Sequence, residues 1–135
     1  CGLYYALVPL ASEAALDDLA VNPNAPPLID SRAGLVDKEC WLYFYIRTGS
    51  KAVRTRMFCH EAGSWVEDVA TGSAAGPLAC HLAPIDAAFT QGSSRRAIIH
   101  VRSTRRESER VVVGGSVVRV AEGWWRLPSA AGSGA

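Results

Sequence analysis

The sequence has almost no excess charge of either sign and no long apolar run. Its 14 lysines and arginines nearly balance 13 aspartates and glutamates, for a formal net charge of +1. This balance gives no electrostatic basis for binding nucleic acid or an anionic membrane surface. No apolar stretch approaches the ~20 residues that a membrane-spanning helix needs, and no signal-peptide pattern is present. We therefore expect partners that are neither nucleic acids nor membranes.

Cysteine is scarce as well. The four cysteines are Cys1, Cys40, Cys59 and Cys80. Their wide spacing argues against a disulfide scaffold and favours a reducing compartment, so we expect a cytoplasmic protein. The sequence starts at Cys1 rather than at methionine, and we expect the chain to be cropped, processed or incompletely recorded.

Two of the cysteines precede histidines, in Cys59-His60 and Cys80-His81. Thiolate and imidazole are ligands that zinc prefers. Adjacent residues, however, point to opposite faces of a strand and diverge by ~100° on a helix, which is poor geometry for chelation. We expect buried cysteines beside partly exposed histidines and no metal site.

What the chain does contain is enough apolar sequence for one domain. Apolar residues make up 49% of its 135 residues, which is ordinary for a globular protein with a real core. We predict a single domain over residues 1–127. Residues 128–135 are mostly small, and we expect them to form a flexible tail.

The first half of the chain predicts strands and a short helix. Leu3 to Leu10 is rich in aromatic and aliphatic residues, as strands are, and Ser12 is suited to cap a short helix that ends near Leu19. Cys40 to Arg47 is apolar on both faces, which is typical of a central, covered strand. The next predicted strand, Ala52–Cys59, alternates its side chains so that both of its arginines share one face.

The second half begins with a predicted helix over residues 74–83, apolar nearly all round, which indicates burial. Ile85 to Ser94 is expected to be a loop, and Ala97–Ser103 a strand. Antiparallel strands combined with one buried helix make an α+β fold.

A hairpin is predicted near the end of the chain. Gly114-Gly115 would turn a strand at Arg110–Val113 into a second strand at Ser116–Glu122. Trp124-Trp125 follows, and we expect an indole there to pack on the core. Tryptophan is also a common anchor of protein interfaces.

The most informative segment runs from Glu67 to Leu78, where an acidic turn leads through Thr71-Gly72-Ser73 into the predicted helix. Several backbone N–H groups and the helix dipole point at one spot there, and this arrangement can bind a carboxylate or phosphate without a cationic side chain. Thr71 or Ser73 can cap the helix. The alternative interpretation is a well-capped buried helix with no ligand.

This segment, Glu-Asp-Val-Ala-Thr-Gly-Ser-Ala-Ala-Gly, resembles the signature Glu-Asp-Pro-Ala-Thr-Gly-Ser-Ala-x-Gly of the PhzF-like phenazine-biosynthesis isomerases, which are relatives of diaminopimelate epimerase. Arg54 to Phe58 is similar to the strand that leads into this loop in the family. Gly2-Leu3 followed by Leu7 to Leu10 resembles the start of the family's second domain, and Val117 to Gly123 resembles its closing strand. The resemblance therefore covers most of the chain.

The resemblance implies a particular fold. It is a mixed, mostly antiparallel sheet wrapped around one buried central helix, which is one half of a diaminopimelate-epimerase-like protein. Family members have two such domains with the active site between them, and the acid/base glutamate lies in the first domain. Nothing in this sequence matches that first domain, so the chain resembles a second half alone.

The resemblance also implies the site residues. Asp68 and Ser73 match family positions that line the substrate pocket, and the ligand-binding set carried over is Asp68, Thr71, Gly72, Ser73 and Ala74. Asp68 is the candidate for proton transfer, although it could merely accept hydrogen bonds within its loop. Val69 replaces the usual proline of the signature. The two-cysteine racemisation of the epimerases is not expected, because the Thr-Gly-Ser run has no cysteine.

Two functions follow. A lone half exposes apolar surface and strand edges, so we expect a homodimer or a complex with a companion first-half chain. In the first function, the chain is a binding module for a small carboxylate, an amino acid or a peptide in a biosynthetic pathway. In the second, it is half of a cofactor-independent isomerase or epimerase, and its partner supplies the glutamate.

Overall fold

The structure, a computed structural model, describes residues 3–30, 38–94, 96–103 and 110–126. The strands are β1 (Tyr4–Pro9), β2 (Ile29–Asp30), β3 (Lys38–Gly49), β4 (Ala52–Glu61), β5 (Ser64–Asp68), β6 (Ile85–Gln91), β7 (Ala97–Ser103) and β8 (Val112–Gly114), and the helices are α1 (Glu13–Asp17) and α2 (Gly72–Leu82). The predicted tail at 128–135 lies outside the described residues. Within them, no helix is long and apolar enough to cross a bilayer.

The strands join in one curved sheet. Its order is β1-β3-β4-β6-β7-β8, with β2 beside β3 and β5 beside β4. The pairs β1/β3 and β4/β6 are parallel, and the other pairs are antiparallel. Each parallel pair needs a long crossover, which contains α1 and β2 in the first case and β5 and α2 in the second. The predicted α+β class with a mixed, mostly antiparallel sheet is confirmed.

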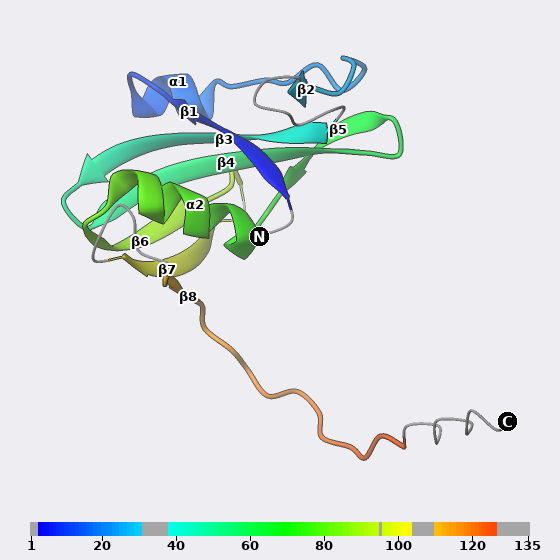
Figure 1. Cartoon of the computed structure of the whole chain (residues 1–135), viewed down its shortest axis with the longest axis vertical. Coiled ribbons are helices and arrows are strands. Elements are labelled where there is room, and N and C mark those ends of the chain that lie inside the picture. Colours follow the sequence, from blue (N-terminus) through cyan, green and yellow to red (C-terminus); the bar gives the residue numbers. More distant parts are fainter. Residues whose placement is uncertain (1–2, 31–37, 95, 104–109, 127–135) are drawn as a thin grey trace, which may run out of the picture.

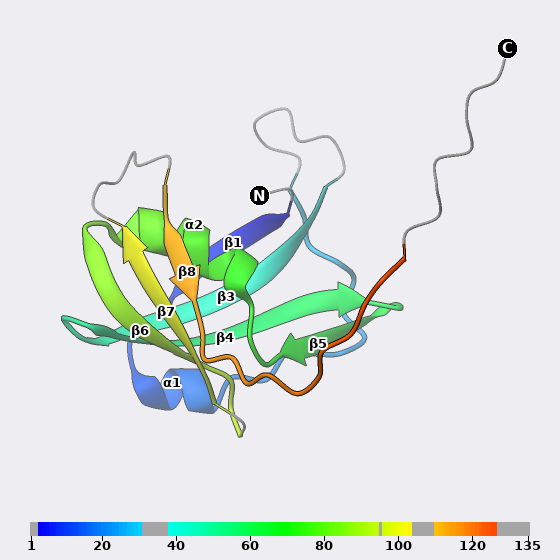
Figure 2. The ribbon, with the colours of Figure 1, turned by 90° about the horizontal axis from the view of Figure 1, so that it is seen from below.

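The sheet curls around α2, which lies between β3 and β4 on one side and β6 to β8 on the other (Figures 1 and 2). One stripe of this helix is fully buried in the core: Ala74, Ala75, Leu78 and Ala79. Their spacing places them on a single helical face. Tyr43, Met57 and Phe89 from three strands pack in the same core.

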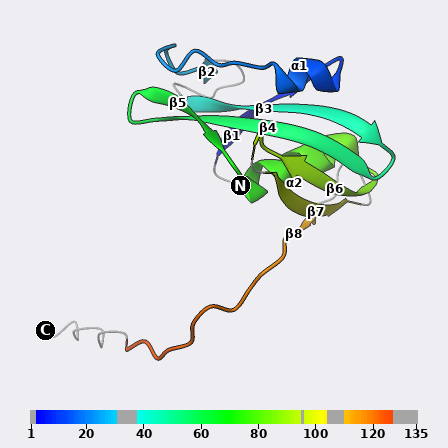
Figure 3. The same cartoon turned by 180° about the vertical axis from the view of Figure 1, so that it is seen from behind.

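Helix α1 covers the opposite face of β3 and β4 (Figure 3). Ser12 caps it as predicted, since its Oγ accepts a hydrogen bond of 3.1 Å from the N–H of Ala15. The helix ends at Asp17, shortly before the expected Leu19. Arg54 from β4 donates to both carboxylate oxygens of Asp17, at 2.6 and 3.1 Å. The arginine face of β4 therefore holds α1, while its apolar face packs against α2.

The stretch expected to be a loop, Ile85 to Ser94, is largely strand β6. Its residues alternate in burial, with Ile85, Ala87, Phe89 and Gln91 turned into the core. Alanine and aspartate have little intrinsic preference for strands. The strand forms because β4 and β7 both pair with it, on opposite edges.

Strand β5 was not predicted either. A two-residue turn joins it to β4, with Ala62 and Gly63 at φ of 49° and 83°. Positive φ at both central positions is the geometry of a hairpin turn that matches the strand twist. Alanine is uncommon at such a position, so the sequence carried only a weak signal for this hairpin.

The predicted hairpin at Gly114-Gly115 is wrong. Gly114 is the last residue of the ladder with β7, opposite His100, and Gly115 lies next to the backbone of Ile98, so the chain continues beside β7 rather than turning back. Residues 115–126, which we call the arm, form no regular structure and are exposed throughout. The arm leads away from the sheet (Figure 1). The side chain of Trp124 is fully exposed and that of Trp125 is 88% exposed, so the expected packing of an indole on the core does not occur.

Candidate functional site

The candidate site forms where β4 divides one edge between two partners. The first half of β4, Ala52–Thr55, pairs with the end of β6, and the second half, Met57–Glu61, pairs with β5. Strand β5 ends at Asp68 and β6 ends at Gln91. Both ends therefore meet at the middle of β4, and the loop into α2 starts there.

Gln91 holds this loop. It is completely buried, and its Nε2 donates to the carbonyl oxygen of Asp68 and to Oγ1 of Thr71, both at 2.9 Å. Its Oε1 accepts from the backbone N–H of Thr71 at 3.3 Å and from the Tyr43 hydroxyl at 3.2 Å. The amide thus uses both its donors and both acceptor positions. This residue was missed from the sequence, because nothing in the pattern distinguishes it from a surface glutamine.

Asp68 closes the loop on itself. Its Oδ2 accepts a hydrogen bond of 2.6 Å from the Thr71 hydroxyl, and its Oδ1 lies 3.5 Å from the N–H of Ala70. Thr71 is the N-cap residue of α2 but makes no side-chain capping bond. The expected cap by Thr71 is therefore wrong, since its hydroxyl serves the Asp68 carboxylate instead.

A cavity of about 400 Å³ lies in front of this loop, and Asp68, Thr71, Gly72 and Ser73 all line it. Two loop amides, those of Ala70 and Thr71, are turned to Asp68 and Gln91 rather than to the cavity. The first N–H groups of α2 follow, and such groups have no partner within their own helix. Ala74 is fully buried in the core.

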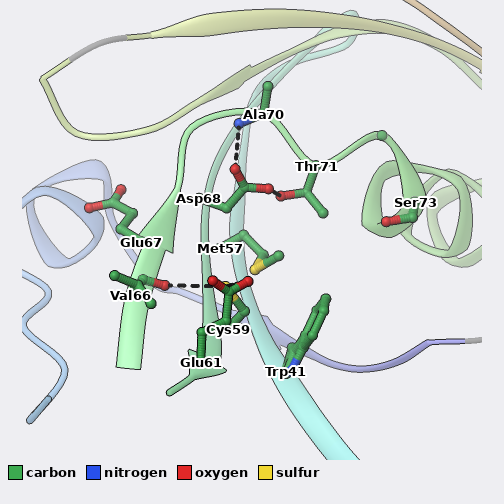
Figure 4. A pocket seen from close by; sticks show the side chains of 11 residues that line it. Trp41, Met57, Cys59, Glu61, Val66, Glu67, Asp68, Ala70, Thr71 and Ser73 are labelled. Carbon is green, nitrogen blue, oxygen red and sulfur yellow. Dashed lines mark hydrogen bonds between the residues drawn. The ribbon is translucent and has the colours of Figure 1, made fainter. Parts of the chain in front are cut away.

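The other walls of the cavity come from the sheet. Figure 4 shows Trp41 and Met57 on one side, with the carboxylate of Glu61 and the thiol of Cys59 beside them. The side chain of Glu67 points away from this group, as expected for the neighbour of Asp68 on a strand. None of the described residues that line the cavity is lysine or arginine.

Ser73 stands at the opposite wall, on the first turn of α2. Its hydroxyl lies 2.7 Å from the hydroxyl of Tyr5 on β1. Burial raises the pKa of Tyr5, while the hydrogen bond with Ser73 acts in the other direction. Tyr5 packs edge-on against Trp41, with ring centroids 5.9 Å apart. Strands β1 and β3 thereby place an aromatic pair beside the start of the helix.

Cys59 carries a protonated thiol at neutral pH. Burial raises its pKa to about 11, and the hydrogen bond to Glu61 adds to this effect. The thiol has one hydrogen to donate and two acceptors within reach, Oε1 of Glu61 at 3.5 Å and the carbonyl oxygen of Val66 at 3.7 Å. Within the described part of the chain, no three His, Cys, Asp or Glu side chains are grouped so that they could hold a metal ion.

Glu67 is held as a carboxylate on the α1 side of the sheet. Burial alone would raise its pKa, but the hydrogen bonds from Arg56, at 2.9 and 2.8 Å, outweigh this effect and lower it below its ordinary value of 4.5. Ser93 donates a further bond of 3.2 Å. The ion pair therefore anchors β5, and with it the start of the site loop.

Acid is expected to weaken the fold through Glu67. Because its pKa is lower in the folded state than in the unfolded state, its contribution to stability is fully present above pH 4.5 and is lost as pH falls through the folded-state pKa. The free energy of unfolding, measured with urea between pH 7 and pH 3, should fall across this window. Asp17 has a lowered pKa as well, so the Glu67→Gln variant should keep part of the decline but show a shallower one. An equal slope in both proteins would contradict the assignment.

The chain can be compared with known proteins on this basis. Residues 1–123 match the PhzC-PhzF family, described as phenazine biosynthesis-like protein. Searches of the curated proteins and of the solved structures find no match. The family match covers most of the chain, includes the loop and the cavity, and is consistent with an isomerase-like fold related to biosynthesis. The chain therefore belongs to the PhzC-PhzF family of phenazine biosynthesis-like proteins.

Proposed function

We propose that this chain corresponds to the second half of a two-domain family member. It acts as a dimeric module that binds a small amino acid, or a peptide end, in a cytoplasmic biosynthetic pathway. The ligand's carboxylate lies at the start of α2, against Gly72 and Ser73. Its amino group lies on the side of Asp68 and Glu61.

The observation that carries this proposal is the opposite polarity of the two ends of one cavity. The first turn of α2 offers backbone N–H groups, a hydroxyl and the positive end of the helix dipole. The other end offers the carboxylates of Asp68 and Glu61 (Figure 4). Because the described residues of the lining include no cationic side chain, a simple carboxylate would meet net repulsion, whereas a zwitterion meets attraction at both ends.

Binding is favoured over turnover because neither Asp68 nor Cys59 is well prepared to accept a proton from a substrate. Both oxygens of Asp68 are engaged within their own loop, which suits a positioning role. The thiol of Cys59 stays protonated at neutral pH, because burial raises its pKa to about 11, and so it is not available to accept a proton. Proton abstraction needs a base within hydrogen-bond reach of the substrate C–H.

The alternative is a half-isomerase. The family match favours it, because the isomerases that the chain resembles place their glutamate in another domain. In that case a partner chain covers the open side of the cavity and supplies the glutamate, and Asp68 becomes the candidate for the second proton transfer. A complex that turns over an amino acid only when both chains are present would favour this alternative.

Removing polar groups from the two ends should weaken binding. We expect Ser73→Ala and Asp68→Asn each to raise the dissociation constant of an amino acid by about tenfold, because each loses a hydrogen bond to a charged group. Calorimetry with a panel of amino acids and dipeptides identifies the best binder. The same binder without its amino group, or without its carboxylate, should then bind more weakly than the zwitterion.

Matched controls are available outside the cavity. Ser50→Ala removes an exposed hydroxyl in the turn between β3 and β4, and Asp86→Asn changes an exposed aspartate paired with Arg102. Both controls should bind like the parent. Unchanged affinity in Ser73→Ala and Asp68→Asn would remove the loop from the binding site.

A further inference from the structure

A second cavity, which we call the apolar cavity, borders the loop that leads into α2. Its volume is about 540 Å³, which is in the range typical of small-molecule sites. Its walls include Ala97 and Ile99 of β7, Val113 of β8 and the adjoining Gly115. The described residues that line it carry no charge, and Ser116 contributes the one polar side chain among them. The contacts proposed above for the ligand's carboxylate and amino group leave this cavity unused.

The apolar cavity meets the cavity of the candidate site, which we now call the charged cavity, at the loop itself. Ala70 and Gly72 line both cavities, and both residues are exposed. The sheet supplies different walls to each, from β3 to β5 in the charged cavity and from β7 and β8 in the apolar one. The side chain of Ala70 points away from the Asp68 carboxylate (Figure 4). A ligand that lies against Gly72 therefore borders both cavities.

Gly72 leaves space between the two cavities because it has no side chain. A Cβ atom added at this position would lie 3.7 Å from Cγ1 of Val113, which lines the apolar cavity. A larger side chain at residue 72 would therefore extend towards that wall. The proposed function places the ligand's carboxylate against Gly72, and the Cα atom of an amino acid is bonded directly to its carboxylate. The ligand's side chain thus begins next to the apolar cavity.

We propose that the apolar cavity binds the ligand's side chain, and that the site selects amino acids with an aliphatic side chain of about the size of leucine. A peptide that ends in such a residue belongs to the same class. This inference rests on the proposed function, because the carboxylate and the amino group fix the point from which the side chain extends. It adds the chemical class of the side chain, which the charged cavity does not determine.

The charged cavity is the competing position for the side chain, since Trp41 and Met57 give it some apolar surface. An aliphatic group placed there would take water from the carboxylates of Asp68 and Glu61 without offering them a hydrogen bond, which is unfavourable. In the apolar cavity the same group meets uncharged walls. Each methylene removed from water raises the affinity by about fourfold. The three carbons that leucine has beyond alanine should therefore give about tenfold even when they are only partly buried.

Calorimetry of the full chain with three free amino acids tests this selectivity. Leucine should bind about tenfold more tightly than alanine. Asparagine has nearly the shape of leucine but ends in an amide, so it should bind no more tightly than alanine, because the amide would lose water in an apolar cavity. Equal affinities for leucine and alanine, or for leucine and asparagine, would overturn the inference.

A pair of neighbouring valines on β8 provides a variant and its matched control. Val113 lines the apolar cavity and is 39% exposed, whereas Val112 is 64% exposed and is not part of the lining. Val113→Ser should lower the ratio of leucine affinity to alanine affinity by about fivefold, because the wall loses apolar surface. Val112→Ser should keep the parent's ratio. The ratio removes any effect of a variant on the carboxylate and amino contacts, and an unchanged ratio in Val113→Ser would contradict the assignment of this wall.

Nuclear Overhauser contacts locate the side chain directly and need no variant, so they decide the question even if Val113→Ser fails to fold. The methyl groups of bound leucine should contact those of Val113 and Ile99. Contacts to the methyl group of Met57 instead would place the side chain in the charged cavity and overturn the inference. If amino acids bind but leucine does not, the inference also fails and the proposed function stands. If no amino acid of the calorimetric panel binds, the proposed function fails and this inference fails with it.

Discussion

Replacing Arg56 with methionine is expected to lower the free energy of unfolding by about 3 kcal/mol. The guanidinium pairs with both carboxylate oxygens of Glu67, and the side chains of Arg56 and Glu67 are only 8% and 22% exposed. The same group donates to the carbonyl oxygens of Leu16 and Leu19, at 3.0 and 2.7 Å, just inside and beyond the end of α1. Methionine leaves these acceptors unpaired and Glu67 without its counter-ion.

The magnitude follows from the burial of the pair. Breaking a buried ion pair by removing one partner costs about 3–5 kcal/mol. We take the lower end, because water can reach part of the Glu67 carboxylate. Urea denaturation monitored by circular dichroism measures the change.

The matched control is Arg102→Met. Arg102 also pairs with a carboxylate, that of Asp86, but both side chains are 66% exposed. Exposed pairs contribute about 0–1 kcal/mol, so this variant should be close to the parent. A loss in Arg56→Met no larger than in the control would contradict the anchoring role of Arg56.

Replacing Gln91 with leucine is expected to cost about 2–3 kcal/mol and to loosen the site loop. Leucine has a similar size but leaves the N–H of Thr71 and the carbonyl oxygen of Asp68 without their buried partner, while the Tyr43 hydroxyl keeps its contact with Thr55. Each buried polar group without a partner costs about 1–3 kcal/mol. The total is smaller than the sum, since the loop can move towards water.

Loop movement distinguishes this variant from a general loss of stability. Hydrogen exchange of the Thr71 amide should accelerate more than exchange of the core strands, because Gln91 directly accepts from that amide. Thr90→Val is the control, since Thr90 lies next to Gln91 on β6 but on the other face. Equal protection of Thr71 in Gln91→Leu and the parent would show that Gln91 does not position the loop.

These two residues also link the fold to the proposed binding function. Arg56 secures β5 on one side of the sheet, and Gln91 secures the loop on the other side. The cavity lies between the loop, the start of α2 and the second half of β4. Either variant should therefore weaken amino-acid binding even though neither residue is expected to touch the ligand.

Local patterns in the sequence predicted those parts of the structure that are determined by near neighbours. Ser12 caps α1 as predicted. Strands β1 and β7 lie where their compositions predicted them, and the arginines of β4 share one face. The loop at residues 68–73 could be singled out from its own residues and from its resemblance to the family signature. A cap, a strand alternation or a turn involves residues a few positions apart, and so a single sequence displays it.

Pairing between distant segments determined the rest. Strand β6 has weak strand residues and forms because β4 and β7 flank it, and β5 forms across a turn with little sequence signal. Thr71 bonds to Asp68 rather than capping α2, because Gln91, twenty residues later, holds that hydroxyl in place.

The sequence by itself thus determined the fold class, the family and the loop that borders the cavity, because composition, alternation and a contiguous signature are local properties of the chain. Only the tertiary structure decided which walls face that loop, with Trp41, Glu61 and Tyr5 brought in from other strands. It also decided that the glycine pair at 114–115 lies in an extended path rather than a turn. The physical reason is the same in both cases: a side chain's partners and a strand's edge are set by the arrangement of the whole sheet, which residues far apart in the sequence build together.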